Sequence, residues 1–565
     1  MNILPFFFAV FVVSVWYRIC SIHNTFVLWL EFPVIREILA WSSEWQCPTL
    51  MMNLRDALLT SLLTLPGTRE FHLHVLVTSP RKHSALYPFA QPRPRCYLQD
   101  IIVLLSEQAT PDVPRVFVSA IEAAVYNIPI TSCAVLYISK VDTTGQGIAP
   151  APTANLLRTL LTFYADPESR PFAANHLWIH LFARAQSQYL FPNSADYGGK
   201  HPLTDVKLCA WWKRIFDDVA GELENRTKSM AKIRLFYVIP GCSESEASNS
   251  LNFASTSTTT TSSTHTHWTY GHPYSQSEIP LPCPASETSH NLGHFIPSFE
   301  DDPKSRFMDE IAYTTEADGV KSPARKRLRK DSTQDEEPKR EVIRRKGDER
   351  VQGELSEVTP DEFWERMSFR QECIAGTLTG FFAMGVSCSI SKDLSRSEMS
   401  PLVPQAGQVS SQMTKRIMSS LLTGHEFSTV ERCVRATGIL EETIKGLCDG
   451  LKIADDTLPT ISSSHSGSSS QTDSKRQSTP EPEPKSQMLA PPQTPPPRMH
   501  NGKRVIPDVS PNPFPEPVIS LETYGSYIYG SVHVDNPPLP PKIPSGTGNS
   551  TPRVTVLAVR KKKRT

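Results

Sequence analysis

The first half of the chain alternates apolar runs with turn residues and proline clusters. Four runs are rich in β-branched and aromatic residues, which is typical of strands. They read HLHVLVT (72–78), CYLQDIIVLL (96–105), VFVSAIEAAVY (116–126) and CAVLYISKV (133–141). Three others show apolar positions at helical spacing: MNLRDALLTSLLTLPG (52–67), TANLLRTLLTFYA (153–165) and LCAWWKRIFDDVAGELE (208–224). The pattern predicts an α/β fold with a mixed central sheet surrounded by helices.

Polar stretches divide this pattern. A Ser/Thr tract opens a predicted disordered insert at about 243–290, and a charged insert follows at about 316–358. Helices are expected again from Pro360 to about Gly450. The Pro/Ser-rich stretch 453–552 has too few apolar residues to offset the entropy of ordering, so we predict a disordered tail. The chain closes at 553–565 with a short strand pattern and a basic cluster. These boundaries predict one large core over 52–452.

Residues 1–51 form an apolar extension before this core. The run 3–16 is shorter than the roughly 20 residues of a spanning helix, and it lacks the basic start and small-residue cleavage site of a signal peptide. We interpret the segment as an extension from an upstream start, and whether it is expressed stays open. A membrane tether is the alternative.

Composition and short motifs limit the expected cellular compartment and the kinds of binding site. The net charge is zero because 58 basic residues balance 58 acidic ones that lie in separate blocks. The eleven cysteines are scattered and include no CxxC pair, which argues against a zinc site or a disulfide framework and fits a reducing compartment. No metal is therefore predicted. The sequence contains no P-loop and no GxGxxG motif, which disfavours ordinary nucleotide folds.

The segment FEDDPKSRF (299–307) carries the most distinctive chemistry. Asp301 and Asp302 are adjacent, and Lys304 follows two positions later. Pro303 disfavours helical geometry at Asp302, so we expect an extended turn to present both Asp302 and Lys304. A neighbouring carboxylate favours the protonated acid and a neighbouring ammonium has the opposite effect. A solvated acidic turn is the alternative interpretation.

Six further motifs occur with this segment. They are ISKVDTTG (138–145), SQYLFPNS (187–194), Lys200-His201, Trp211-Trp212, FWERMSFRQE (363–372) and LLTGHEFSTVERCV (421–434). Together they resemble the fungal Rtt-type (regulator of Ty transposition) histone H3 lysine acetyltransferase family, over segments that cover a little over half of the chain. The resemblance implies a core of the kind found in coactivator-type histone acetyltransferases, with long inserts.

The resemblance also implies catalytic roles. A free lysine has a pKa near ~10.4, so acetyl transfer at neutral pH needs a base. By resemblance, Asp302 is the acid/base candidate, Asp301 orients or tunes it, and Asp142 is a further acid. Trp212 would line the lysine channel, with Tyr189 close by, although a core tryptophan and a buried tyrosine are the plain alternatives. Lys304 matches the lysine that this family acetylates on itself.

Acetyl-CoA is the implied acetyl donor. The resemblance implies that it contacts Val141, Asp142, Thr143, Pro150, Ala151, Pro152, Thr153, Ala154, Phe182, Gln186, His201, Pro202, Leu203 and Trp211. Adjacent helical residues point about 100° apart, so we expect Trp211 and Trp212 to line different walls. Two departures from the family bear on activity. The loop 150–154 reads PAPTA, without basic residues and with two prolines that lack N–H groups. Glu300 replaces a usual proline and adds a third acid.

Basic clusters and the resemblance together suggest a cellular role. ARKRLRK (324–330) and RKKKR (560–564) are typical of nuclear-import signals or acidic-partner sites, with a solvated charge run as the alternative. The resemblance implies acetylation of newly synthesised histone H3, bound to H4, in replication-coupled nucleosome assembly and the DNA-damage response. Implied partners are an anti-silencing-function histone chaperone and a nucleosome-assembly-family chaperone, without sequence-specific nucleic acid binding or stable membrane association. The alternatives are a catalytically weak nuclear scaffold that binds histone chaperones and a membrane-associated protein.

Overall fold

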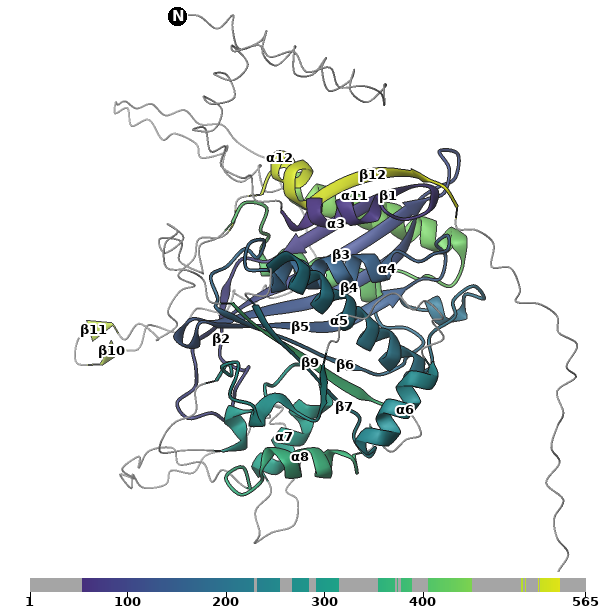
Figure 1. Cartoon of the computed structure of the whole chain (residues 1–565). Coiled ribbons are helices and arrows are strands. Elements are labelled where there is room, and N and C mark those ends of the chain that lie inside the picture. Colours follow the sequence, from purple (N-terminus) through teal and green to yellow (C-terminus); the bar gives the residue numbers. More distant parts are fainter. Residues whose placement is uncertain are drawn as a thin grey trace, which may run out of the picture. The chain divides into compact units, whose positions relative to one another are not determined.

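The fold is a ten-stranded mixed sheet with helices on both faces, seen in a computed structural model (Figure 1). The structure describes residues 53–227, 231–254, 267–283, 291–313, 354–370, 373, 378–388, 405–449, 499–500, 503–504, 517 and 519–538. Its helices are α3 (Leu54–Leu62), α4 (Thr153–Ala165), α5 (Asp205–Thr227), α6 (Glu244–Ala254), α7 (Pro303–Tyr313), α8 (Pro360–Met367), α10 (Ser411–Thr423), α11 (Val430–Asp449) and α12 (Leu521–Thr523). The predicted fold class is confirmed.

The strands lie in the order β12-β1-β3-β4-β5-β6-β9-β7-β8, and β2 pairs with β3 outside this path. Their bounds are β1 (Gly67–Val77), β2 (Arg81–His83), β3 (Cys96–Gln108), β4 (Val116–Ile128), β5 (Cys133–Thr143), β6 (His176–Ala183), β7 (Ala231–Val238), β8 (Trp268–Tyr270), β9 (Gly380–Cys388) and β12 (Tyr529–Asn536). Strands β10 (Met499–His500) and β11 (Lys503–Arg504) pair with each other. The pairs β5–β6 and β7–β8 are parallel, so the carboxyl ends of β5 and β6 meet at one edge.

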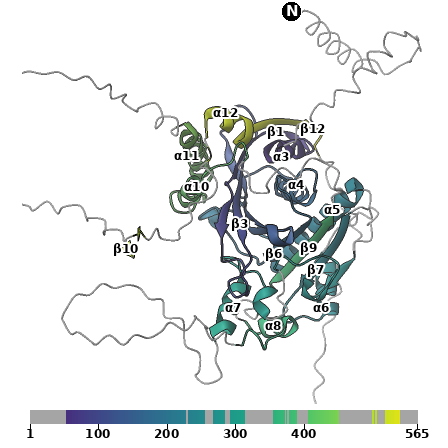
Figure 2. The same ribbon diagram turned by 90° about the vertical axis from the view of Figure 1, so that its left-hand side faces the viewer.

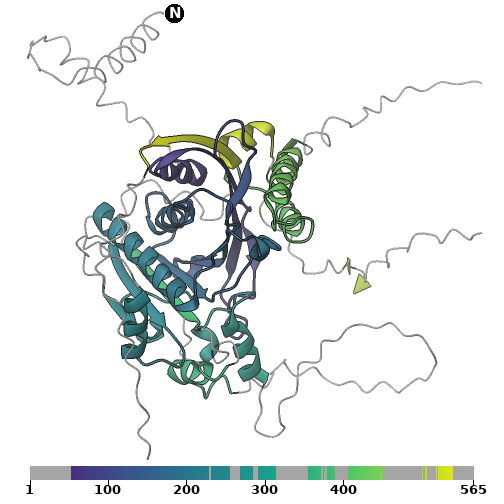
Figure 3. The ribbon, with the colours of Figure 1, turned by 90° about the vertical axis from the view of Figure 1, so that its right-hand side faces the viewer.

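Both faces of the sheet are covered, which explains the near-continuous apolar strands. In β3, Ile101 and Val103 pack into the core under α3, α4 and α5, whereas Ile102 and Leu104 pack against α10 and α11. The views from the two sides show these helix groups on opposite faces (Figures 2 and 3). A further apolar cluster lies under α7 and α8.

The predicted strands coincide with β1, β3, β4 and β5, and the three predicted helices coincide with α3, α4 and α5. Helices α8, α10 and α11 lie in the stretch from Pro360 to about Gly450 where helices were expected, but the strand β9, which was not predicted, lies there too. Its sequence GFFAMGVSC is short and uniformly apolar, since β9 is covered on both faces, and periodicity cannot separate such a strand from a helix.

Two predicted disordered stretches contain ordered elements. Within 243–290, α6 and β8 are formed, and β8 adds to the sheet beside β7. Within 453–552, β12 pairs with β1 over eight residue positions from Gly67 to His74. The strands β8 and β12 gain order from the neighbouring strands with which they pair, and α6 packs Ala247 and Leu251 into the apolar core. Composition alone does not indicate these neighbours. The tail ending at 565, most of the charged insert and the extension 1–51 lie outside the described residues.

Thiols and helix length are two further features of the described residues. Each of the nine cysteines in the described ranges carries a free thiol. Within the same ranges, no helix is both long and apolar enough to span a bilayer.

Candidate active site

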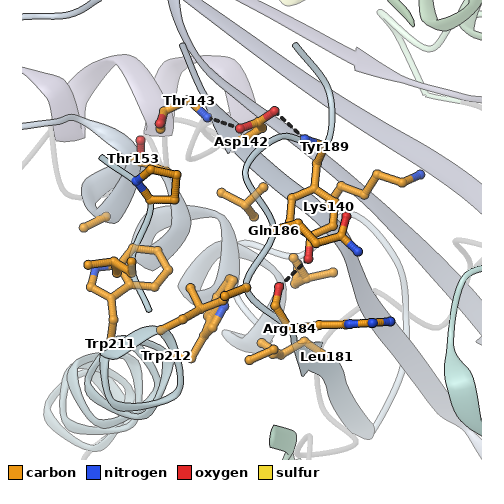
Figure 4. Close-up of a pocket in the computed structure, with 18 of the residues that line it drawn as sticks. Lys140, Asp142, Thr143, Thr153, Leu181, Arg184, Gln186, Tyr189, Trp211 and Trp212 are labelled. Carbon is orange, nitrogen blue, oxygen red and sulfur yellow. Dashed lines mark hydrogen bonds between the residues drawn. The ribbon is translucent and has the colours of Figure 1, made fainter. Parts of the chain in front are cut away.

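A pocket of about 310 Å³ opens where the carboxyl ends of β5 and β6 meet (Figure 4). Ligands of sheet proteins commonly bind at the carboxyl ends of parallel strands. Helix α5 supplies one wall through Leu208, Trp211 and Trp212, which are spaced to share one helix face. The first residues of α4 and the segment from Arg184 to Leu203 supply the others.

Asp142, near the end of β5, organises this pocket. One carboxylate oxygen accepts hydrogen bonds from the backbone N–H groups of Tyr189 (2.7 Å), Leu190 (2.8 Å) and Phe191 (3.1 Å). The other lies 2.8 Å from the ammonium of Lys200 and accepts the N–H of Thr143. Both charged side chains are 5% exposed. A buried carboxylate with this many donors holds the segment from Tyr189 to Phe191 in place against the end of β5.

Tyr189 and the two tryptophans face the pocket. The Tyr189 hydroxyl donates to the backbone carbonyl of Arg184 (Figure 4), and burial raises the pKa of this phenol to about 12. The indoles of Trp211 and Trp212 meet edge to face, with ring centroids 4.9 Å apart. Both line the pocket, so the expectation that they occupy different walls is wrong: each large ring reaches the cavity although the two Cα–Cβ bonds diverge.

The acidic turn differs from the extended turn that the sequence suggested. Helix α7 begins at Pro303, so Lys304 lies in its first turn. Proline is well suited to the first helical position because its missing N–H would be unpaired there anyway. Asp302, just before this helix, is fully buried and lies 2.6 Å from the Lys304 ammonium. That ammonium also lies 4.9 Å from the ring centroid of Phe381. The pair is enclosed and is not exposed in the 310 Å³ pocket.

Asp301 is the accessible member of the acid pair. Its side chain is 49% exposed and lies 2.7 Å from the Lys140 ammonium, which also pairs with Glu122 at 2.9 Å. Lys140 and Glu122 face each other across β5 and β4, where opposite charges stabilise strand pairing. Burial disfavours the charged lysine, but the hydrogen bonds that its ammonium donates to Asp301 and Glu122 outweigh this effect, so the pKa of Lys140 is raised.

Lys140 and Ser139 belong to two neighbouring pockets. The second pocket, of about 560 Å³, is lined by residues that include Glu122, Tyr137, Phe299, Glu300 and Asp301. Phe299 stacks on Tyr137 with ring centroids 3.9 Å apart, which fixes the start of the acidic turn against β5. Lys140 thus lies at the boundary between the first pocket and the acidic turn.

The predicted cofactor residues mostly converge. Those that line the first pocket are Val141, Asp142, Thr143, Ala151, Thr153, Ala154, Phe182, Gln186, His201, Pro202, Leu203 and Trp211, and the predicted catalytic residues Trp212 and Tyr189 join them. Pro150 and Pro152 do not line it. Asp301 lines the second pocket, Asp302 lines neither, and Lys304 borders a small third cavity beside His180 and Trp364.

Sequence reasoning missed three charged residues of this region. Lys140 stands two positions before Asp142, and Lys200 precedes His201, yet neither was assigned a role. Arg184 lies between two recognised pocket residues, Phe182 and Gln186. A basic residue two positions before a functional acid on one strand was a usable signal for Lys140, because alternate residues share a face.

Comparison with known proteins now identifies the family. The model of the histone acetyltransferase KAT11-type domain matches residues 151–443, just over half of the chain. The chain belongs to the KAT11-type histone acetyltransferase family. The matched region includes α4, α5, β6 and the acidic turn, and it begins at the loop that borders the pocket.

Individual relatives agree with this membership. A histone acetyltransferase rtt109 from Aspergillus flavus is 30% identical over 294 residues, covering 48% of this chain and 45% of the relative. One from Schizosaccharomyces pombe is 26% identical over 272 residues, covering 48% of this chain and 57% of the relative. The chain therefore matches only about half the length of these relatives. The crystal structure of Rtt109 from Aspergillus fumigatus has a similar fold, with a TM-score of 0.51 and 23% identity over 70% of this chain and 96% of that one.

Proposed function

We propose that this protein transfers acetyl groups from acetyl-CoA to lysines of newly synthesised histone H3. The preferred target is the core-domain lysine near the point where DNA enters the nucleosome, with tail lysines as further targets. The main support is the pocket at the carboxyl ends of β5 and β6. Lys140 lines this pocket and pairs with Asp301 of the acidic turn. Family membership and the histone acetyltransferase relatives support the choice of reaction.

The residues of the first pocket fit acetyl-CoA. A cavity of about 310 Å³ with two indoles, Leu203 and Leu208 suits an extended, largely apolar arm. The N-terminus of α4 has no side-chain cap, so its first-turn N–H groups, beyond Pro152, are open to a phosphate, for which helix N-termini are favourable. When bound, acetyl-CoA supplies the thioester whose carbonyl carbon the lysine amine attacks.

The acidic turn would manage the charge and proton of the acceptor lysine. The carboxylate of Asp301, whose side chain is 49% exposed, would attract the lysine ammonium and take its proton before the amine attacks. The amine nitrogen would then form the C–N bond of the amide as the C–S bond of the thioester breaks, and the proton that the nitrogen loses would leave with CoA as its thiol. Asp302, fully buried against Lys304, would position the turn. This division gives Asp301 the direct role and Asp302 the positioning role.

Lys304 would be the self-acetylation site. The Lys304 side chain is only 4% exposed, and Asp302 is the counter-charge of its ammonium. Acetylation removes that charge and leaves an amide N–H that can donate to the same carboxylate. The modification would therefore convert a buried ion pair into a neutral hydrogen bond.

We further propose a nuclear protein that works in replication-coupled assembly and the DNA-damage response. The motivation is the basic clusters at 324–330 and 560–564. An anti-silencing-function chaperone and a nucleosome-assembly-family chaperone would present H3 with H4. The catalytically weak scaffold is the competing proposal, and the enclosed Asp302–Lys304 pair is the observation that favours it.

One assay separates these proposals. Full-length purified protein is incubated with labelled acetyl-CoA and H3–H4, with and without each chaperone, and modified lysines are located by mass spectrometry. We expect transfer that either chaperone stimulates. Chaperone binding without transfer, in protein that melts cooperatively, would favour the scaffold. Fluorescence microscopy of the tagged protein in its host tests the nuclear location.

A further inference from the structure

A buried ion pair lies behind one wall of the first pocket. Arg69 on β1 is 1% exposed at its side chain and Glu107 on β3 is 2% exposed, and Arg69 Nη1 lies 3.4 Å from a Glu107 oxygen. Neither residue lines the pocket, and both belong to strands near the far edge of the sheet from β9. Burial raises the pKa of Glu107, opposed by the N–H of Ile148 and by Arg69.

The pair holds the loop that leads into α4. Arg69 donates to the backbone carbonyl of Ile148 at 2.6 Å and to that of Pro150 at 3.1 Å. Glu107 accepts the N–H of Ile148 at 3.0 Å. The next residue after Pro150 is Ala151, which lines the pocket together with Thr153 and Ala154. The two charged side chains therefore bind the main chain at Ile148 and Pro150, immediately before the residues that line the pocket.

The loop also lies flush against the sheet at Gly147. A Cβ added there would stand 2.9 Å from Val118 Cγ1 and 3.0 Å from a Glu107 oxygen. A larger residue at 147 would have to displace the loop or the side chains of Val118 on β4 and Glu107 on β3. The close approach gives a second way to disturb the same placement, in which neither Arg69 nor Glu107 is itself substituted.

Stability alone does not account for this pair. A buried ion pair is often no more stabilising than apolar residues of similar volume. Arg69 Nε and Glu107 Oε2 are also buried without a hydrogen-bond partner among the described residues. What apolar side chains would not supply is the set of hydrogen bonds to Ile148 and Pro150. The pair specifies the place of the loop.

We propose that Arg69 and Glu107 are positioning residues for acetyl-CoA, which fix the loop 147–152 and with it the open N-terminus of α4. The inference rests on the proposed acetyl-CoA site. It explains how a loop without basic residues could serve a phosphate: the charges lie behind the loop, and the uncapped first residues of α4, Thr153 and Ala154, line the pocket.

The main test replaces both charges with apolar groups, Arg69→Met with Glu107→Leu, so that no unpaired charge is left inside. We expect the KM for acetyl-CoA to rise at least about tenfold, with kcat at saturation within about threefold and the KM for H3–H4 unchanged. Direct titration with acetyl-CoA should show the same loss of affinity. The control is Arg115→Met with Glu441→Leu, an ion pair 3.1 Å apart for which no hydrogen bond or ion pair to residues 147–152 is described.

Two single variants keep the test decisive if the double variant fails to fold. Gly147→Ala should weaken acetyl-CoA binding by displacing the loop, and Glu107→Gln, which keeps an acceptor for Ile148 N–H, should lose less affinity than the apolar pair. Unchanged acetyl-CoA affinity in a folded double variant, or in folded Gly147→Ala, overturns the inference. Absence of acetyl-CoA binding by the wild type would instead reject the proposed function.

Discussion

The ammonium of Lys140 lies 2.7 Å from a carboxylate oxygen of Asp301, a contact that joins β5 to a turn more than 150 residues later in the chain. Two residues beyond Lys140, Asp142 holds the segment from Tyr189 to Phe191. The end of β5 therefore positions both the acidic turn and the loop that closes the first pocket. Changes at Lys140 should act on the turn more than on the cofactor wall.

Replacing Lys140 with methionine keeps much of the side-chain volume and removes the charge that orients Asp301. We expect kcat to fall about tenfold, within the range of general acid–base effects, while acetyl-CoA affinity changes little. Steady-state kinetics and titration give the two numbers. Lys232→Met, at an exposed position of β7, is the control. Equal losses of kcat for Lys140→Met in the presence and absence of Asp301→Asn would contradict the proposed coupling.

The Asp302–Lys304 pair predicts a stability effect that can be separated from catalysis. Asp302→Asn leaves a buried ammonium without a counter-charge, and breaking a buried pair costs about 3–5 kcal/mol. Adding Lys304→Gln, which resembles acetyl-lysine, should restore most of the free energy of unfolding. Denaturant melts of the wild type, both single variants and the double variant measure this cycle.

Activity in the same variants distinguishes the two aspartates. If Asp302 positions the turn, the neutral double variant should recover at least about a tenth of wild-type kcat, whereas Asp301→Asn should lose at least about tenfold in a folded protein. A stable but inactive double variant would return the acid/base role to Asp302, as the family resemblance originally suggested.

The sequence was sufficient to predict the strands that pair with near neighbours. β3, β4 and β5 are long, apolar and bounded by turns, and each pairs with the preceding strand. It was insufficient for β9, which inserts between β6 and β7, and for β12, which pairs with β1 from the opposite end of the chain. Their order depends on neighbours that are remote in sequence.

Much of the pocket could also be predicted, because β5, α5 and the segment from Gln186 to Leu203 each carry a recognisable motif. The burial of the side chains in the acidic turn could not be predicted. Whether Asp301 or Asp302 is exposed depends on where α7 begins and on packing against Phe381 and Tyr137, and the sequence of the turn contains neither fact. The pair Arg69–Glu107 could not be predicted from the sequence either, because its hydrogen-bond partners in the loop are backbone atoms.

The two tryptophans should differ in the balance between stability and binding. Trp212 is 5% exposed and packs against Phe216, so Trp212→Ala should cost about 3–5 kcal/mol of stability. Trp211 is only partly buried, so Trp211→Ala should cost less and chiefly weaken acetyl-CoA binding. Thermal melts and acetyl-CoA titration test this. Trp212→Phe is the conservative control, which should regain stability. Equal stability losses for the two alanine variants would contradict the packing argument.

Buried histidines should make the fold sensitive to acid. Burial, aided by the nearby Lys304 charge, lowers the pKa of His180 to about 3. The unfolded chain binds a proton near pH 6.5 and the folded protein does not, so stability is lost as the pH falls from about 6.5 towards 3. At pH 5 the loss is about 2 kcal/mol for this residue. His180→Phe should remove that part of the pH dependence. Parallel curves of unfolding free energy between pH 8 and pH 5 for wild type and variant would contradict it.

Two truncations distinguish a structural role of β12 from a recognition role of the residues after it. Removing residues 517–565 should strongly destabilise the protein, because it exposes the edge of β1 and removes Ile519, Tyr524 and Ile528 from the core beside α11. Removing only 539–565 keeps β12 but deletes the basic cluster at 560–564. This shorter truncation should leave the thermal melt and the basal activity on H3–H4 unchanged.

The basic cluster at 560–564 should contribute to chaperone binding through charge. Clustered lysines attract an acidic partner over a distance that salt limits, with a Debye length of about 8 Å at physiological ionic strength. We therefore expect weaker binding to an acidic histone chaperone at low salt, and a smaller difference from the full chain as salt rises. Affinity measured across a salt series, beside a thermal melt of each protein, gives both results. A lowered melting temperature in the 539–565 truncation would indicate a structural role for this segment, and unchanged affinity at every salt concentration would rule out the electrostatic one.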